Sequence, residues 1–201
     1  MPLSDLSADQ QQAFWDRLKE LGMDPSQVVA SITPQTHQGP VLLSPDETRS
    51  AVPPHFLTLA SVDDVKRLAG NVDEDYANGV LENHHAEFPE WPENRVELDR
   101  RELTPEENRR LVAAEVAYVY GDSRRLKGYR AALDRHKFPV RVVAFAVEDI
   151  CLDATNSPLT VTADSLHNFG TVTICDGGWI QFDANATVTI QKLVKSDRIK
   201  C

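Results

Sequence analysis

Histidine and aspartate residues near the ends of an apolar run are the first candidates for chemistry in this sequence. His136 precedes the run Val140–Val147, Asp149 and Asp153 follow it, and His167 comes later. Imidazole and carboxylate side chains can act as general acids and bases, and functional residues are commonly found where strands end. These four residues predict, as one hypothesis, a small hydrolase or isomerase with its site at the junction of helices and sheet.

Motifs that mark the common enzyme classes do not occur in this chain. The Gly-x-Ser-x-Gly turn of many hydrolases is absent, and so are the glycine-rich loops that bind phosphates or dinucleotides. The sequence therefore predicts no cofactor. It favours a protein that is not an enzyme over the hydrolase or isomerase alternative.

Two adjacent histidines, His84 and His85, follow an acidic stretch of the chain. Neighbouring side chains on a helix point about 100° apart, so the two imidazoles cannot readily bind one metal ion. Glu82 and His85 are three residues apart and can share a helix face, which makes them the candidate metal ligands. The helical zinc motif needs two histidines four residues apart, and we therefore expect a solvated helix end without a metal.

The three cysteines, Cys151, Cys175 and Cys201, have no spacing typical of a metal site. Free cysteine is commonly buried. The sequence therefore predicts two small buried residues and one free thiol at Cys201. A Cys151–Cys175 bridge is the alternative, without further support from the sequence.

The chain is acidic, with a formal net charge of −10 and an isoelectric point near 5.0. Nucleic acids and anionic membranes attract positively charged proteins, so neither is an expected partner. No apolar run approaches the roughly 20 residues of a membrane span. The first residues lack the basic and apolar segments of a secretory signal. We expect a soluble cytoplasmic protein, with export independent of a signal peptide as the alternative.

The tripeptide Thr-Val-Thr occurs three times, at residues 160–162, 171–173 and 187–189, and Trp-Ile-Gln-Phe stands at residues 179–182. Each run alternates polar and apolar side chains, which is the period of a half-buried strand. Turn residues separate the runs. The region therefore predicts a module of short strands.

The period of two assigns the side chains of this module to two faces. The apolar face is predicted to comprise Val172, Ile174, Ile180, Phe182, Val188 and Ile190. The opposite, threonine-rich face is predicted to comprise Thr171, Thr173, Thr187 and Thr189. We expect the first set to share one core and the second set to face away from it.

Residues 166–174 (Leu-His-Asn-Phe-Gly-Thr-Val-Thr-Ile) and 176–180 (Asp-Gly-Gly-Trp-Ile) resemble β-helix repeats of bacterial surface and polymer-forming proteins. The resemblance implies that each short strand stacks on its counterpart in the next coil. The three Thr-Val-Thr tripeptides start 11 and 16 residues apart, which is irregular for such a repeat. A compact sandwich or meander is therefore the first prediction and a solenoid-like module the second.

Helix signals dominate the earlier part of the chain. A capping box opens a helix at Ser7, and Thr104 with Pro105 opens another. Asp24 and Pro25 predict a short helix that buries Val28, Val29 and Ile32, and a short strand is expected at Val41–Leu43. Val140–Val147 is a continuous apolar run and predicts a central strand.

The order of these elements predicts an α+β fold class. A helical N-terminal part is expected to precede a C-terminal antiparallel β-sandwich or meander, or a short β-solenoid-like module. The corresponding domains are residues 1–138, mainly helical with irregular connectors, and the β module at 139–201. One compact domain is the alternative.

The leading functional hypothesis is a non-enzymatic binding or self-assembly protein that presents a threonine-rich β surface. Trp91, Trp179 and Gln181 are the candidate binding residues, because aromatic and small polar side chains suit protein or carbohydrate surfaces. Exposed strand edges favour pairing between chains. We expect a homo-oligomer or a protein partner, with a carbohydrate as a further possible ligand.

Overall fold

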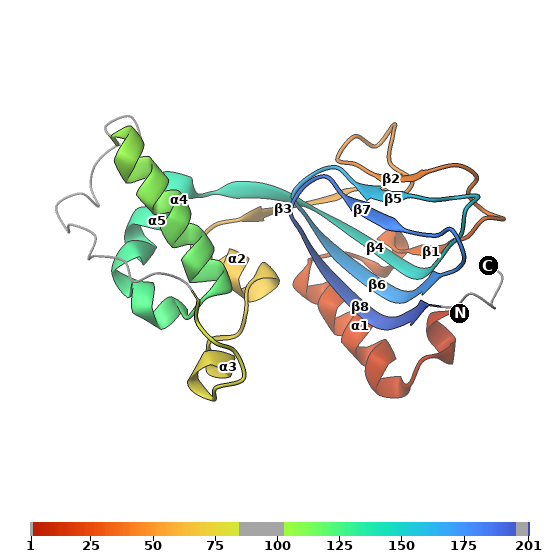
Figure 1. Ribbon diagram of the computed structural model, residues 1–201, viewed down its shortest axis with the longest axis horizontal. Coiled ribbons are helices and arrows are strands. Elements are labelled where there is room, and N and C mark those ends of the chain that lie inside the picture. The colour runs from red at the N-terminus through yellow and green to blue at the C-terminus, as the bar shows by residue number, and fades with distance from the viewer. Residues whose placement is uncertain (1, 85–102, 196–200) are drawn as a thin grey trace. The chain divides into compact units, whose positions relative to one another are not determined.

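The computed structural model describes residues 2–84, 103–195 and 201, and Figure 1 labels its elements. The described helices are η1 (Leu3–Asp5), α1 (Ala8–Glu20), η2 (Pro25–Gln27), α2 (Val62–Ala69), α3 (Asp73–Ala77), α4 (Pro105–Tyr120), η5 (Ser123–Tyr129) and α5 (Arg130–Lys137). The described strands are β1 (Val29–Ile32), β2 (Val41–Leu43), β3 (His55–Leu59), β4 (Val140–Leu152), β5 (Leu159–Val161), β6 (Ser165–Ile174), β7 (Ile180–Phe182) and β8 (Ala186–Lys195). Helices are thus interspersed among the strands.

The chain divides into two units. The first unit comprises Met1–Leu57 and Val142–Cys201, and the second comprises Thr58–Arg141. The second unit is therefore an insertion into the sequence of the first. The first unit carries most of the strands and the second carries α2 to α5.

The described strands form two largely parallel sheets. The larger has five strands in the order β1-β4-β6-β8, with β3 paired to β4, and the smaller has the order β2-β5-β7. The pairs β1–β4, β4–β6, β6–β8, β2–β5 and β5–β7 are all parallel. The predicted fold class is wrong: the protein is α/β with mostly parallel strands, not a helical part followed by an antiparallel β module. Parallel neighbours need a long connection, and here the connection from β4 to β6 and from β6 to β8 passes through a strand of the other sheet.

Successive passes of the chain stack on one another in the first unit. Ser165 of β6 pairs with Val143 of β4, which precedes it by 22 residues, and with Ala186 of β8, which follows it by 21. In the smaller sheet, Leu159 of β5 pairs with Ile180 of β7, again 21 residues later. Register partners therefore form rows that run across the stack, which we call ladders.

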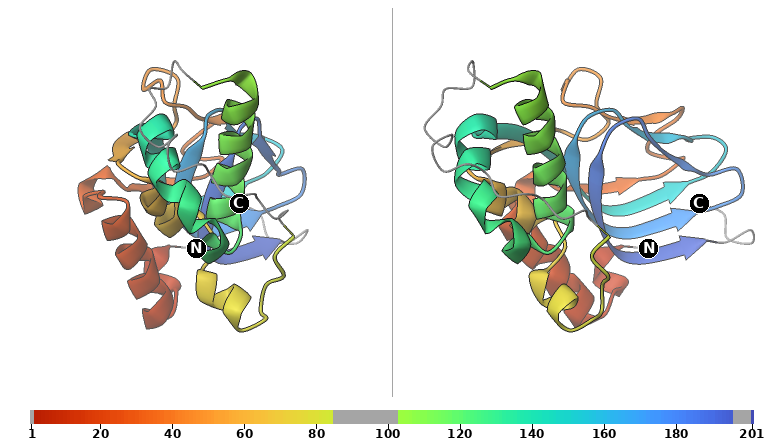
Figure 2. Two further views of the ribbon diagram at one scale, coloured as in Figure 1. Left: turned by 90° about the vertical axis from the view of Figure 1, so that its left-hand side faces the viewer. Right: turned by 60° about the vertical axis from the view of Figure 1, so that its left-hand side comes forward.

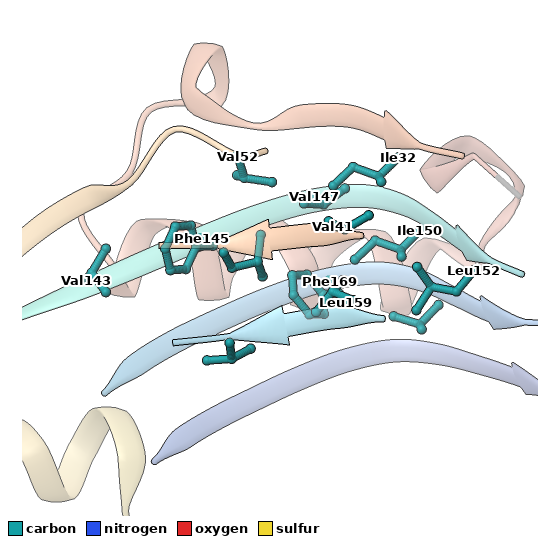
Figure 3. Packing of buried hydrophobic residues seen from close by; sticks show 13 residues of the cluster. Ile32, Val41, Val52, Val143, Phe145, Val147, Ile150, Leu152, Leu159 and Phe169 are labelled. Carbon is teal, nitrogen blue, oxygen red and sulfur yellow. The ribbon is translucent and has the colours of Figure 1, made fainter. Parts of the chain in front are cut away.

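An apolar core fills the space between the two sheets, as Figure 3 shows from close by. Val172 belongs to this core, and Ile174, Ile180, Val188 and Ile190 pack against it. The prediction that these five side chains share one core is confirmed. Phe182 was predicted with them, but it is 52 % exposed.

Helix α1 contacts β6 and β8, and it begins at the predicted capping box. The Ser7 side chain accepts a hydrogen bond from the Gln10 backbone N–H, and the Gln10 side chain accepts one from the Ser7 N–H. Gln10 Nε2 also donates to the Gln191 carbonyl of β8 at 2.8 Å, and Asn168 Nδ2 of β6 donates to the Phe14 carbonyl at 2.8 Å. Side-chain to backbone hydrogen bonds therefore tie α1 to the larger sheet.

The threonine-rich face is covered on β6, because Thr171 and Thr173 are both buried. Thr187 and Thr189 on β8 are half-buried. The period of two correctly separated these side chains from the apolar set, but it carries no information about what covers the second face. An exposed threonine surface is therefore not present on β6.

The predicted helix that buries Val28, Val29 and Ile32 is wrong. Pro25 begins only the three-residue helix η2, and Val29 is the first residue of β1. β-Branched side chains favour a pleated strand over a helix. Strand β1 then pairs with β4 through Val29–Val147 and Ile32–Ile150, a contact that local sequence does not reveal.

All four long-sheet strands bend at one level of the stack. The register passes from Val147–Phe169 to Asp149–Thr171, so Glu148 and Gly170 stand together between the regular pairs. Gly170 has no room for a side chain, because an added Cβ would meet the Glu148 carbonyl oxygen and would lie 3.1 Å from Leu3 Cδ1. The close approach of two backbones at this bend therefore requires glycine.

Gly170→Ala is expected to lower the free energy of unfolding by about 1–3 kcal/mol, the usual cost of forcing extra volume into a filled site. Urea unfolding followed by circular dichroism measures the loss. Gly128→Ala is the matched control, because an added Cβ there meets nothing within 4 Å. Equal stability of the two variants would contradict the close packing at the bend.

The second unit is mainly helical. Thr104 caps α4 in a capping box with Pro105 at the start of the helix, as predicted. Lys66 Nζ donates to the Gly121 carbonyl at 2.6 Å, just beyond the end of α4, and forms an ion pair with Asp73 at 3.0 Å. A cation at the carbonyl end of a helix is favourable, and this contact connects α2 to α4.

Candidate functional site

His167 lies inside the core of the first unit. Its ring stacks on Phe145 at 5.4 Å between centroids and is tilted against Phe169 at 5.3 Å. The Ser165 hydroxyl donates to the Ala163 carbonyl at 2.7 Å, so its oxygen can accept from His167 Nε2, which is 2.8 Å away. Burial lowers the pKa of His167 to about 4. The imidazole is therefore neutral near pH 7 and belongs to the packing of the core.

Asp149 and Asp153 lie farther along the stack than His167. Phe145 is the register partner of His167, and Asp149 follows Phe145 by four residues, which is roughly 13 Å of strand. Asp153 follows the end of β4 and uses Oδ1 to accept from the Thr155 N–H at 2.7 Å. The structure therefore does not bring these three predicted site residues together.

The other predicted site residues do not join this group. His136 is buried on α5 in the second unit. Glu82 is exposed and lies 3.8 Å from His84 Nε2. His85, the second candidate metal ligand, and Trp91, a candidate binding residue, lie outside the described residues.

The three cysteines lie together at one end of the strands. Cys151 and Cys201 form a disulfide, and Cys175 is a buried free thiol. Cys175 Sγ is 2.9 Å from Cys201 Sγ and 3.8 Å from Cys151 Sγ. The predicted burial of Cys151 and Cys175 is confirmed, but the free thiol is Cys175 rather than Cys201.

The stacked passes explain why cysteines distant in sequence meet. Thr173 is the register partner of Cys151, and Cys175 follows Thr173 by two residues. The Cys175 N–H also donates to the Leu152 carbonyl at 2.8 Å, which fixes its backbone beside β4. Gln35 Nε2 donates to the Cys201 carbonyl at 2.7 Å and holds the third cysteine. The 22-residue offset of the ladders was the missing signal.

The environment of Cys175 favours the protonated thiol. Burial raises the pKa of Cys175, the negative charge of Asp153 raises it further, and the Cys201 N–H opposes both effects. A thiol with a raised pKa is a poor nucleophile at neutral pH. Within the oxidised cluster, Cys175 therefore stays a neutral side chain.

The last strands of the stack expose positions that are buried in every earlier pass. Ile32, Ile150 and Val172 are at most 3 % exposed, whereas their ladder neighbour Leu193 on β8 is 61 % exposed. In the smaller sheet the ladder Leu43, Val161 and Phe182 ends in the same way, with only Phe182 exposed. Apolar residues therefore continue to the final strands, which we call the open end of the stack.

The open end also has unpaired backbone. No described strand pairs with the outer edge of β8, which the right-hand view of Figure 2 shows at the margin of the larger sheet. Trp179, a predicted binding residue, is 49 % exposed just before β7. Gln181, the other, is half-buried on β7 and donates to Asp183 Oδ1 at 2.6 Å. The open end therefore includes two of the three candidate binding residues.

No family model, curated protein or solved structure matches this chain. Among the described residues, no helix is both long enough and apolar enough to cross a membrane.

Proposed function

We propose that the protein is a non-enzymatic assembly protein that pairs with a second copy of itself through the open end of the stack. The observation that carries the proposal is the change along the apolar ladders, from buried in the inner passes to exposed at Leu193 and Phe182. Stacked folds need a polar cap at their ends to stay apart in solution. An apolar end instead favours association.

The edge of β8 supplies directional contacts for such a pairing. Its outward backbone N–H and carbonyl groups form a template for another strand. A ten-residue strand, Ala186–Lys195, offers a long edge for this purpose. Hydrogen bonds between backbones would fix the register, and burial of Leu193 and Phe182 would contribute most of the free energy of association.

The distribution of charge along β8 favours a second copy, paired antiparallel, as the partner. Asp164 and Asp183 lie at the start of β8, where Asp164 accepts from the Asn185 N–H at 3.0 Å, and exposed Lys195 ends the strand. Antiparallel pairing of two β8 strands about a twofold axis places the acidic start of each beside the basic end of the other. Such a self-complementary interface is typical of homodimers.

Leu193→Asp is the test of this function. Wild-type protein at high concentration is expected to sediment as a dimer, and the variant as a monomer with an unchanged circular dichroism spectrum. The reason is that an aspartate at the centre of the interface would be buried without a partner. Sedimentation velocity and light scattering measure the two masses.

Val80→Asp is the matched control, because Val80 is 69 % exposed in the second unit and far in sequence from β8. It is expected to remain dimeric. A wild-type protein that stays monomeric at high concentration would refute the proposal, and so would a Leu193→Asp variant that still dimerises. The hydrolase or isomerase alternative stays a prediction, and none of the observations above favours it.

A further inference from the structure

We propose that reduction of the Cys151–Cys201 disulfide converts the three cysteines into a binding site for a soft divalent cation such as Zn²⁺. The proposal is independent of the assembly function, because it concerns the Cys151, Cys175 and Cys201 cluster and not the open end. The three Sγ atoms lie within 4.8 Å of one another, although the residues are far apart in sequence. Thiolate sulfur is a preferred ligand of such cations.

The distances suit a tetrahedral site once the disulfide is broken. Two thiolates on one zinc ion lie about 3.8 Å apart, since each Zn–S bond is about 2.3 Å long. Cys151 and Cys175 already have an Sγ–Sγ separation of 3.8 Å. Reduction removes the covalent bond from Cys201 Sγ, which must then move away from Cys151 to a non-bonded separation. That movement is in the direction that the third ligand requires.

The scaffold holds two of the ligands in place. Cys151 is on β4, and the Cys175 backbone is hydrogen-bonded to Leu152 of the same strand. Ligands on rigid elements bind a metal with little loss of conformational freedom. Cys201 is half-buried, so the cluster borders solvent and water can supply the fourth ligand.

The chemistry balances in two steps. A dithiol donates two electrons and two protons to the Cys151–Cys201 bond, becomes a cyclic disulfide, and leaves two protein thiols. The cation then displaces the thiol protons of Cys151, Cys175 and Cys201 to solvent and forms three metal–sulfur bonds. Oxidation reverses the sequence and releases the cation, so the disulfide and the bound metal exclude one another.

The test is a titration of the full-length protein with Co²⁺, a spectroscopic substitute for Zn²⁺, before and after reduction by a phosphine. Reduced wild-type protein is expected to bind one Co²⁺ with an intense thiolate-to-metal absorption band, which added Zn²⁺ abolishes. Oxidised protein is expected to show no such band. Zn²⁺ should also raise the melting temperature of the reduced protein only.

Cys175→Ser should weaken Co²⁺ binding by at least about tenfold, since even the loss of a group that only supports a ligand costs 10–100-fold. Cys201→Ser is the second variant, because Cys201 is half-buried and its replacement disturbs the core less. Thr173→Ser, which changes the register partner of Cys151 without removing a sulfur, is the matched control and should retain the band. A reduced wild-type protein without the band would overturn the proposal, as would equal bands in wild type and both cysteine variants.

Discussion

Val172→Asp is expected to lower the free energy of unfolding by about 4 kcal/mol or more, which would leave the first unit largely unfolded near room temperature. Val172 is fully buried between the two sheets. Its ladder neighbours Ile150 and Leu193 flank it on both sides, so a carboxylate there has neither water nor a partner. An unpaired buried charge is among the most costly single substitutions.

Leu193→Asp is the matched control for this prediction, because Leu193 is the register partner of Val172 and occupies the same ladder at the open end. At a low protein concentration, where monomers predominate, it should cost less than about 1 kcal/mol. Thermal melting and urea unfolding measure both variants. Equal losses would mean that β8 is covered as fully as β6 within one chain.

Acidification is expected to destabilise the protein through His167. Burial lowers the folded-state pKa of His167 to about 4, whereas the unfolded chain has an ordinary histidine pKa of about 6.5. Below pH 6.5 the unfolded state therefore binds a proton that the folded state excludes. Stability is unaffected by this group at higher pH, falls between pH 6.5 and 4, and is lower by about 2 kcal/mol at pH 5 than at pH 7.

His167→Leu isolates this effect, because leucine fills similar space between Phe145 and Phe169 and does not titrate. Urea unfolding at pH 7 and pH 5 is expected to show a drop for wild type that is about 2 kcal/mol larger than for the variant. His84→Leu, at an exposed position, should behave as wild type. A variant with the same pH dependence as wild type would show that His167 accepts a proton while folded.

Local sequence was sufficient for the helix starts and for several strands. The capping box at Ser7, the cap at Ser61 and the Thr104–Pro105 start are all present where they were predicted. Each of these signals needs only residues within one turn of helix. The strands at Val41–Leu43 and His55–Leu59 also follow from their apolar and β-branched residues.

The repeated tripeptide was misleading about how the strands pair. Residues 160–162 begin in β5 of the smaller sheet, whereas 171–173 and 187–189 lie in β6 and β8 of the larger one. The register pairs Thr171 with Lys192 and Thr187 with Leu166, so the tripeptides do not lie beside one another. Similar residues recur because each strand is β-branched and half-buried, not because they are register partners.

The candidate site depended on tertiary structure to a greater extent. His167 looked like a proton carrier, and only its position between two phenylalanines shows that it is a core residue. Cys151 and Cys175 looked unrelated, and they meet because one pass of the chain brings the end of β6 beside the end of β4.

The sequence by itself determined which side chains share a face of a strand, because that depends only on the period of two along the backbone. It did not determine the direction of neighbouring strands or the cover on the second face. Val172 and Thr171 are adjacent and both are buried, the first by the smaller sheet and the second on the face where α1 contacts β6. Those contacts join residues more than twenty positions apart, and their free energy exists only when the passes are stacked.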